Sequence, residues 1–171
     1  MPNWCTNAIT LQHSDPQRIT ELAALVNYDR SNDSFDPDVE NRLLNYLRPL
    51  PDGVWDYDWC VRNWGTKWEV NVYHVELLSP HCIAFYCETA WTPPIAALAY
   101  AESQKGFDIK AAFIEPGSGI LGFYEGGSEQ YYDYPQSYNE AMDLLDQLPE
   151  FVLDGLDLSN EFTLEFSENV Y

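Results

Sequence analysis

The chain has 171 residues, of which 46% are hydrophobic and 15% aromatic, and its 28 acidic and 8 basic side chains give a formal net charge of −20. Disordered chains are poor in aromatic residues, so this composition predicts a folded body, and the length favours one domain with an appended element. Such a charge repels nucleic acid and anionic membranes and attracts basic protein surfaces. We expect a basic partner protein, with no direct binding of nucleic acid or membrane.

The first 65 residues predict one strand, two helices and an irregular stretch. Polar and apolar residues alternate over 4–12, as in a half-buried strand. Ser14, with a glutamine three residues later and a proline in the first turn, predicts a helix over 14–26. A shorter helix is expected over 36–47, and the aromatic-rich segment 54–65 is expected to be irregular.

The middle of the chain predicts two further strands, a helix and a three-stranded meander. Thr92 followed by two prolines is a strong helix start, and Gly106 ends that helix. Glycine-containing turns separate the later strands. The expected strands are 68–78, 81–89, 107–115, 120–124 and 129–134, and the expected helix is 95–105.

The last third of the chain is acidic and begins near Pro135. Ser137 and Glu140 form a capping-box pattern, which predicts a helix that Pro149 and Gly155 limit. Residues 161–166 alternate between acidic or polar and apolar side chains, which predicts a short edge strand. We expect a domain over residues 1–134 and an acidic extension over residues 135–171 packed on it.

The order of these elements predicts an α+β fold. Strand, helix, strand, strand, helix, strand is the order of a split βαβ, or ferredoxin-like, antiparallel sheet with its helices on one face. Here the meander and an acidic helix/strand extension would follow it.

Four fragments of the sequence carry a resemblance to a known family. They are MPNWCTN at 1–7, NWGTKW at 63–68, TAWTPP at 89–94 and EPGSG at 115–119. In this order they resemble the YubB ferredoxin-like family of phage and conjugative-plasmid accessory proteins, over about residues 1–134. The resemblance implies a ferredoxin-like core and a mobile-element origin, and it carries no catalytic residue over to this chain.

The tryptophan-rich region is one candidate site. Stacked indoles and a lysine can hold a nucleotide-like or peptide ligand, whereas the same tryptophans can simply fill one end of the core. Both readings stay open from sequence alone. The residues of this alternative ligand pocket are Trp4, Asn63, Trp64, Lys67, Trp68 and Trp91.

The histidines and cysteines predict no metal site. Metal centres need three or four convergent ligands, and nothing in the spacing of His74, His81, Cys82 and Cys87 brings them together. The four cysteines are expected to be reduced thiols, although a disulfide between Cys5 and Cys60 stays open. We therefore expect no cofactor and assign no catalytic residue.

The acidic C-terminal third is the leading candidate. From Ala111 to the end the chain has thirteen acids and no lysine or arginine. Carboxylates spaced three or four residues apart on a helix repeat at intervals similar to those of DNA phosphates. The simpler interpretation is a solvated face or a solubility tail. The partner-binding residues that we predict are Glu140, Asp143, Asp146, Glu150, Asp154, Asp157, Glu161 and Glu165.

The sequence thus favours a non-enzymatic, DNA-mimic-like inhibitor of a host nucleic-acid-binding or defence protein. The alternative is a ligand-binding or enzymatic domain centred on the tryptophans. The N-terminus has no basic, apolar leader pattern, so we expect a cytoplasmic protein of the host cell. The oligomeric state and the identity of the target are not determined by the sequence.

Overall fold

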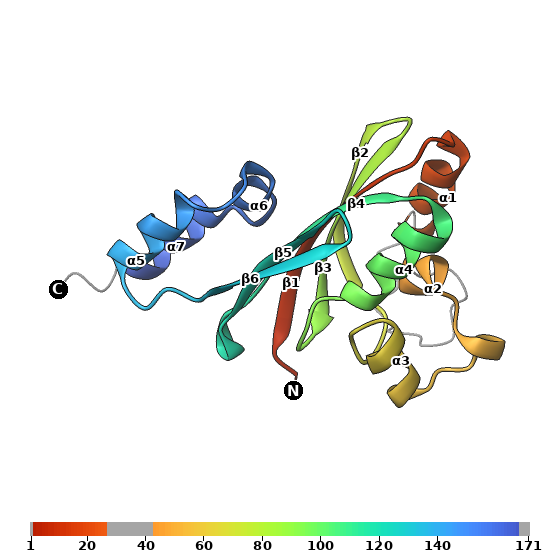
Figure 1. The fold of residues 1–171 in the computed structure, drawn as a ribbon, viewed down its shortest axis with the longest axis horizontal. Coiled ribbons are helices and arrows are strands. Elements are labelled where there is room, and N and C mark those ends of the chain that lie inside the picture. The colour runs from red at the N-terminus through yellow and green to blue at the C-terminus, as the bar shows by residue number, and fades with distance from the viewer. Residues whose placement is uncertain (1, 27–42, 168–171) are drawn as a thin grey trace.

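The computed structural model describes residues 2–26 and 43–167, which form an α+β fold around one open antiparallel sheet (Figure 1). The six strands lie in the order β2-β3-β1-β4-β5-β6. Their bounds are β1 Trp4–Gln12, β2 Asn71–Ser79, β3 Cys82–Ala90, β4 Asp108–Glu115, β5 Ile120–Glu125 and β6 Ser128–Asp133. The expected strands up to residue 134 are thus confirmed to within about three residues at their ends.

Seven α-helices and two short 3₁₀-helices are found in the described part of the chain. None of these helices has the length and apolar composition that crossing a membrane requires. The α-helices are α1 Pro16–Val26, α2 Leu43–Leu47, α3 Tyr57–Asn63, α4 Ile95–Lys105, α5 Tyr138–Leu145, α6 Glu150–Leu156 and α7 Leu158–Ser167, and the 3₁₀-helices are η1 Pro51–Gly53 and η2 Pro116–Ser118.

Helices α1, α2 and α4 cover one face of the sheet. The strict alternation of β1 buries every second side chain, and Ile9 and Leu11 belong to the core on this face. Ile19 and Leu22 of α1 pack into the same core with Leu98 of α4. The two helices that connect strands of the core therefore lie on one face, as the element order predicts.

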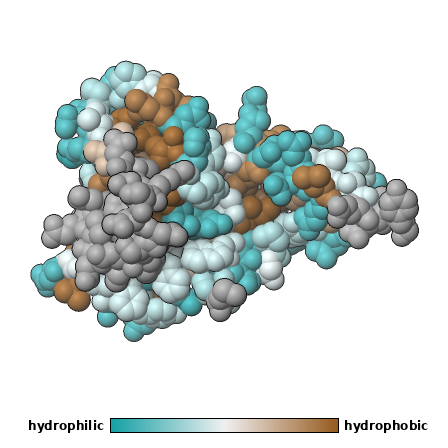
Figure 2. Space-filling view, turned by 180° about the vertical axis from the view of Figure 1, so that it is seen from behind, coloured by the Kyte–Doolittle hydropathy of each residue, from teal (hydrophilic) through white to brown (hydrophobic). Residues whose placement is uncertain are grey.

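The C-terminal helices cover the opposite face, a placement that the sequence does not predict. Helix α6 contacts both β1 and β4, and Val152 and Phe162 are completely buried in this second core. Gly155 permits the close approach, because a Cβ at this position would lie 3.0 Å from the Cβ of Ala8. In Figure 1 these helices form a separate layer beyond the sheet, and Figure 2 shows apolar side chains between the two layers.

The edge strand expected over residues 161–166 is wrong, because this segment is helix α7. Phe162 and Phe166 satisfy a period of two and equally the i, i+4 spacing of a helix. Leu158 extends the helical row and is buried with them, whereas Leu164 is 65% exposed. The segment therefore offers no edge strand for pairing across a dimer.

Three smaller expectations are also corrected. Segment 54–65 is not irregular throughout, since Asp56 caps helix α3 by accepting the Trp59 N–H over 2.7 Å. In α1 the capping carboxylate belongs to Asp15, which accepts from Gln17 over 2.9 Å, and not to the expected serine. Helix α6 begins directly after Pro149, so two helices, α5 and α6, are found where one was expected. Of the helix expected over 36–47, the part before Leu43 lies outside the described residues.

Replacing Phe162 with alanine should destabilise the protein by about 3–5 kcal/mol, since it removes a fully buried ring. Replacing Leu164 with alanine should change stability by less than about 0.5 kcal/mol, because this side chain is mostly exposed. Urea unfolding of the two variants measures the difference. Equal losses would indicate that both side chains share one buried face, as a strand would require.

Candidate functional site

Residues 1–7, 63–68, 89–94 and 115–119 contain segments that meet at one end of the sheet. β1 begins there at Trp4 and β3 ends there at Ala90, and these two residues are Cα partners in the ladder. The Trp91 N–H donates to the Asn3 carbonyl over 2.9 Å, and the Asn3 amide donates to Glu115 over 3.5 Å. Segments far apart in the sequence are thereby joined near the N-terminus marked in Figure 1.

Buried hydrogen bonds fix the two loops that shape this end. The Asn7 amide donates to the Thr89 hydroxyl over 2.9 Å, and that hydroxyl donates to the Thr92 carbonyl over 2.8 Å. The Thr66 hydroxyl donates to the Ala90 carbonyl over 3.0 Å. Since Asn7, Thr66 and Thr89 are all buried, breaking any of these bonds would leave a buried polar group unpaired.

Two residues of these loops adopt positive φ. Gly65 has φ +88°, and a Cβ there would lie 3.1 Å from the Pro93 carbonyl oxygen, so the two loops pack backbone against backbone. The Thr92 hydroxyl donates to the Gly65 carbonyl across this contact over 2.6 Å. Trp91 has φ +71°, an unfavourable conformation for a bulky residue that persists only where surrounding contacts impose it. Such strain is typical of binding and catalytic sites.

An exposed aromatic surface surrounds Lys67 at this end. The Lys67 ammonium lies 5.3 Å from the ring centroid of Trp91, 5.8 Å from that of Trp68 and 6.0 Å from that of Tyr57. The Trp55 indole N–H donates to the Lys67 carbonyl over 3.1 Å. Exposed fractions are 50% for Trp55, 47% for Tyr57 and 38% for Trp91. We call these five side chains the Lys67 platform.

The predicted pocket residues divide between this platform and the core. Lys67, Trp68 and Trp91 belong to the platform, and Trp4, 42% exposed, lies at the adjoining strand end. Trp64 is buried and donates its indole N–H to the Arg48 carbonyl over 2.8 Å, so it is a core residue.

Asn63 also has a local structural role, because its amide donates to the Trp59 carbonyl within α3. Two platform residues, Trp55 and Tyr57, are absent from the predicted pocket. The cap formed by Asp56 was the sequence feature that could have placed both of them at the start of a helix.

The predicted acidic residues lie together on the C-terminal helices. Every one of the eight is exposed, and they are carried on α5, α6 and α7 and at the ends of these helices. No lysine or arginine follows Lys110 in the sequence. The eight are Glu140, Asp143, Asp146, Glu150, Asp154, Asp157, Glu161 and Glu165.

Three of these carboxylates also support the local structure. Glu140 accepts the Gln136 N–H over 2.8 Å, and Asp157 accepts from an asparagine amide three residues later over 2.9 Å. Glu165 accepts from the Tyr134 hydroxyl. Partial burial of the hydroxyl and this hydrogen bond raise the pKa of Tyr134. Substitutions that probe the acidic surface should therefore avoid these three positions.

His74, His81, Cys82 and Cys87 do not converge on one point. The His74 ring centroid lies 5.4 Å from that of Tyr86, with the ring planes tilted by 38°, and Cys87 is completely buried in the core. His81 lies at the hairpin between β2 and β3, beside Cys82. Within residues 2–26 and 43–167, no group of three or more histidine, cysteine or acidic side chains has a geometry that could hold a metal ion.

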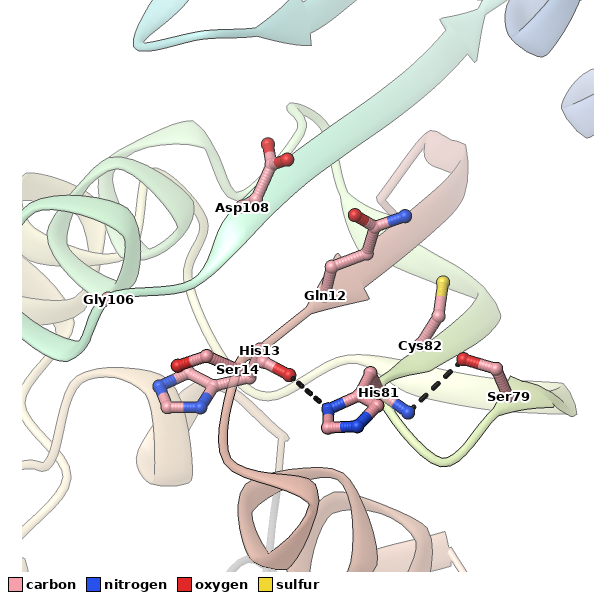
Figure 3. A pocket seen from close by; sticks show the side chains of 8 residues that line it. All are labelled: Gln12, His13, Ser14, Ser79, His81, Cys82, Gly106 and Asp108. Carbon is pink, nitrogen blue, oxygen red and sulfur yellow. Dashed lines mark hydrogen bonds between the residues drawn. The ribbon is translucent and has the colours of Figure 1, made fainter.

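A depression of about 440 Å³ lies at the far end of β1 from Trp4 (Figure 3). His81 Nδ1 is 3.0 Å from the His13 carbonyl oxygen, and the His81 N–H donates to the Ser79 hydroxyl over 3.1 Å. This depression is thus separate from the exposed indoles. It is lined by Gln12, His13, Ser14, Ser79, His81, Cys82, Gly106 and Asp108.

Comparison of the chain with protein-family models, with curated proteins and with solved structures finds no match.

All four cysteines are free and buried. Burial raises the pKa of the Cys5 thiol to about 12 and that of Cys60 to about 11. Burial also raises the pKa of Cys87. A buried thiol with a raised pKa is a poor nucleophile at neutral pH, which argues against a catalytic role for these three residues.

A thiol-reactive reagent near pH 8 should therefore label the native protein slowly, with Cys82, 8% exposed, reacting first. After unfolding in guanidinium without reductant, all four thiols should react. The reagent releases one chromophore for each thiol that it labels, so the absorbance gives the number of reactive thiols. Only two reactive thiols in the unfolded chain would reveal a disulfide, such as the one between Cys5 and Cys60 that the sequence leaves open.

Proposed function

We propose that this chain is a non-enzymatic accessory protein of a phage or plasmid that acts in the cytoplasm of its host. Its acidic C-terminal helices would dock onto the basic groove of a host nucleic-acid-binding or defence protein and block it. The observation that carries this proposal is the placement of eight exposed carboxylates on α5–α7, in a stretch without lysine or arginine.

The helical spacing of the acids supports mimicry of a nucleic acid. Asp143 follows Glu140 by three residues on α5, and Glu165 follows Glu161 by four on α7. At 1.5 Å rise per residue, such pairs repeat about every 4.5–6 Å along the helix axis. Neighbouring phosphates of a DNA strand repeat at a similar order of distance, so a groove that fits phosphates can accept these carboxylates.

The attachment of these helices to the sheet also supports a docking role. A disordered acidic tail would lose conformational entropy on binding, whereas a folded helical layer has its carboxylates already positioned. Most apolar side chains of α5–α7 lie in the second core, with Leu144, Val152 and Phe162 among the buried ones, and α6 joins this core to β1 and β4. This arrangement leaves the acidic faces of the helices in solvent.

The ferredoxin-like assignment of the core belongs to the same proposal. It is supported by the order β2-β3-β1-β4 in the first four strands. It is further supported by α1, which connects β1 to β2, and by α4, which connects β3 to β4, as a split βαβ arrangement requires. The resemblance to the YubB family rests on the four sequence fragments alone.

The proposal predicts that the protein releases selected bacterial proteins from immobilised double-stranded DNA. A bacterial extract is bound to a DNA resin at about 0.1 M salt, and the purified protein is then applied at micromolar concentration. Neutralising Asp143, Asp146 and Asp154 to asparagine should raise the concentration needed for release about tenfold, because charge complementarity steers and holds the complex.

The control for this experiment has the same change in net charge. Its variant carries Asp58→Asn, Glu76→Gln and Asp108→Asn, three exposed acids outside the C-terminal helices, and it should release the bound proteins like the unmodified chain. Equal weakening in both variants would show that only net charge matters. Release that persists undiminished at about 0.5 M salt would also contradict the proposal.

A further inference from the structure

The proposed docking role does not explain the other exposed surface, the Lys67 platform. Three of its four aromatic side chains, those of Trp55, Tyr57 and Trp91, are exposed, Trp68 is half-buried, and the backbone at Trp91 is strained. Burying such rings in the core would be more favourable than exposing them, and contiguous exposed aromatic surfaces mark interaction sites. The platform therefore has the properties of a second binding surface.

The positive charge at the centre of the platform indicates that the ligand carries a negative charge. Two ion pairs occur among residues 2–26 and 43–167, Arg18 with Glu21 and Lys110 with Glu125, and neither involves Lys67. In a protein of net charge −20, the Lys67 ammonium instead lies over three aromatic rings. Its N–H donors are thus not taken by a carboxylate and can bind an anion.

We propose that the Lys67 platform binds a small molecule that joins a planar ring to an anionic group, of which a nucleoside monophosphate is the simplest representative. The planar ring stacks on an exposed aromatic face, an interaction that tolerates any base. The phosphate accepts hydrogen bonds from the Lys67 ammonium. This inference is independent of the function proposed for the C-terminal helices.

The platform is prepared for such a ligand by its fixed geometry. The Trp55 indole is held to the Lys67 carbonyl, and Trp91 follows a strand end fixed by the buried bonds of Thr66 and Thr89. Less side-chain freedom is lost on binding when the stacking groups are already held in place.

The acidic helices do not prevent binding of a small anion at this place. Helix α3, which carries Tyr57, contacts α4 on one side of the sheet, whereas α6 contacts β1 and β4 on the other. Charges separated by more than the Debye length, about 8 Å at physiological salt, are largely screened in solvent. The local ammonium therefore has more influence on the ligand than the distant carboxylates.

The test is a titration of the full chain with AMP and with UMP at about 0.15 M NaCl, followed by tryptophan fluorescence and calorimetry. We expect a Kd below about 1 mM for both nucleotides, with quenching of the indole emission. Adenosine has the planar ring without the anionic group, and inorganic phosphate has the anionic group without the ring. Each should bind at least about tenfold more weakly than AMP.

Two lysine variants decide whether the platform is the site. Lys67→Met keeps the aliphatic stem of the side chain and removes the charge, so it should weaken AMP binding about tenfold. Lys110→Met is the matched control, because Lys110 also lies over an aromatic ring, 5.4 Å from the centroid of Phe151, on the side of the C-terminal helices. It should leave AMP binding unchanged, as should the triple variant of Asp143, Asp146 and Asp154.

Several results would overturn the proposal. They are no binding of either nucleotide up to about 10 mM, equal AMP affinity in Lys67→Met and the unmodified chain, and phosphate alone binding as tightly as AMP. A single-stranded oligonucleotide that binds much more tightly than AMP would instead indicate a nucleic-acid surface. Failure here leaves the DNA-resin experiment unaffected, because that experiment depends on different residues.

Discussion

Apolar contact between the C-terminal helices and the sheet is the interaction on which the acidic surface depends. After Lys110 the chain has no cation, so ion pairs within α5–α7 cannot offset the repulsion between their carboxylates. Helix α6 packs on β1 and β4, and α7 packs on α5 and α6. The burial of residues such as Val152, Leu156 and Phe162 in this second core must exceed that repulsion. Because the apolar sides of the helices face the sheet, the acids are left on the outer surface. The same interaction thus stabilises the layer and directs its charge toward solvent.

Strand β1 connects the two surfaces described here. Its odd-numbered residues, such as Ile9, pack under α1 and α4, and Ala8 on its other face approaches Gly155 of α6. At its first residues, Asn7 supports the loop of the Lys67 platform through Thr89. One central strand therefore positions an aromatic surface at its beginning and an anionic layer on one face. The two surfaces are distinct in chemistry, and each is expected to bind a different kind of ligand.

Most strands and the one-sided distribution of the acidic residues could be predicted from the sequence, because β alternation and local charge are properties of short segments. The sequence-based predictions were wrong where one residue pattern fits both a strand and a helix, and where the exposure of a side chain depends on tertiary packing. Phe162 and Phe166 suit a strand and a helix equally, and only their burial with Leu158 in the second core selects the helix. Trp64 was grouped with exposed tryptophans although it is core. Trp55 was missed, because its hydrogen bond to the Lys67 carbonyl depends on how two segments twelve residues apart pack together.

The most direct test of the account is the salt dependence of folding stability. If the carboxylates of α5–α7 are uncompensated, screening them should stabilise the protein. Raising NaCl from about 0.02 M to about 0.5 M should then increase the free energy of unfolding by about 1 kcal/mol or more. This increase should shrink when Asp143, Asp146 and Asp154 are changed to asparagine. If the free energy of unfolding stays constant or falls with added salt, these charges are already balanced within the molecule. That result would contradict an uncompensated anionic surface available to a basic partner.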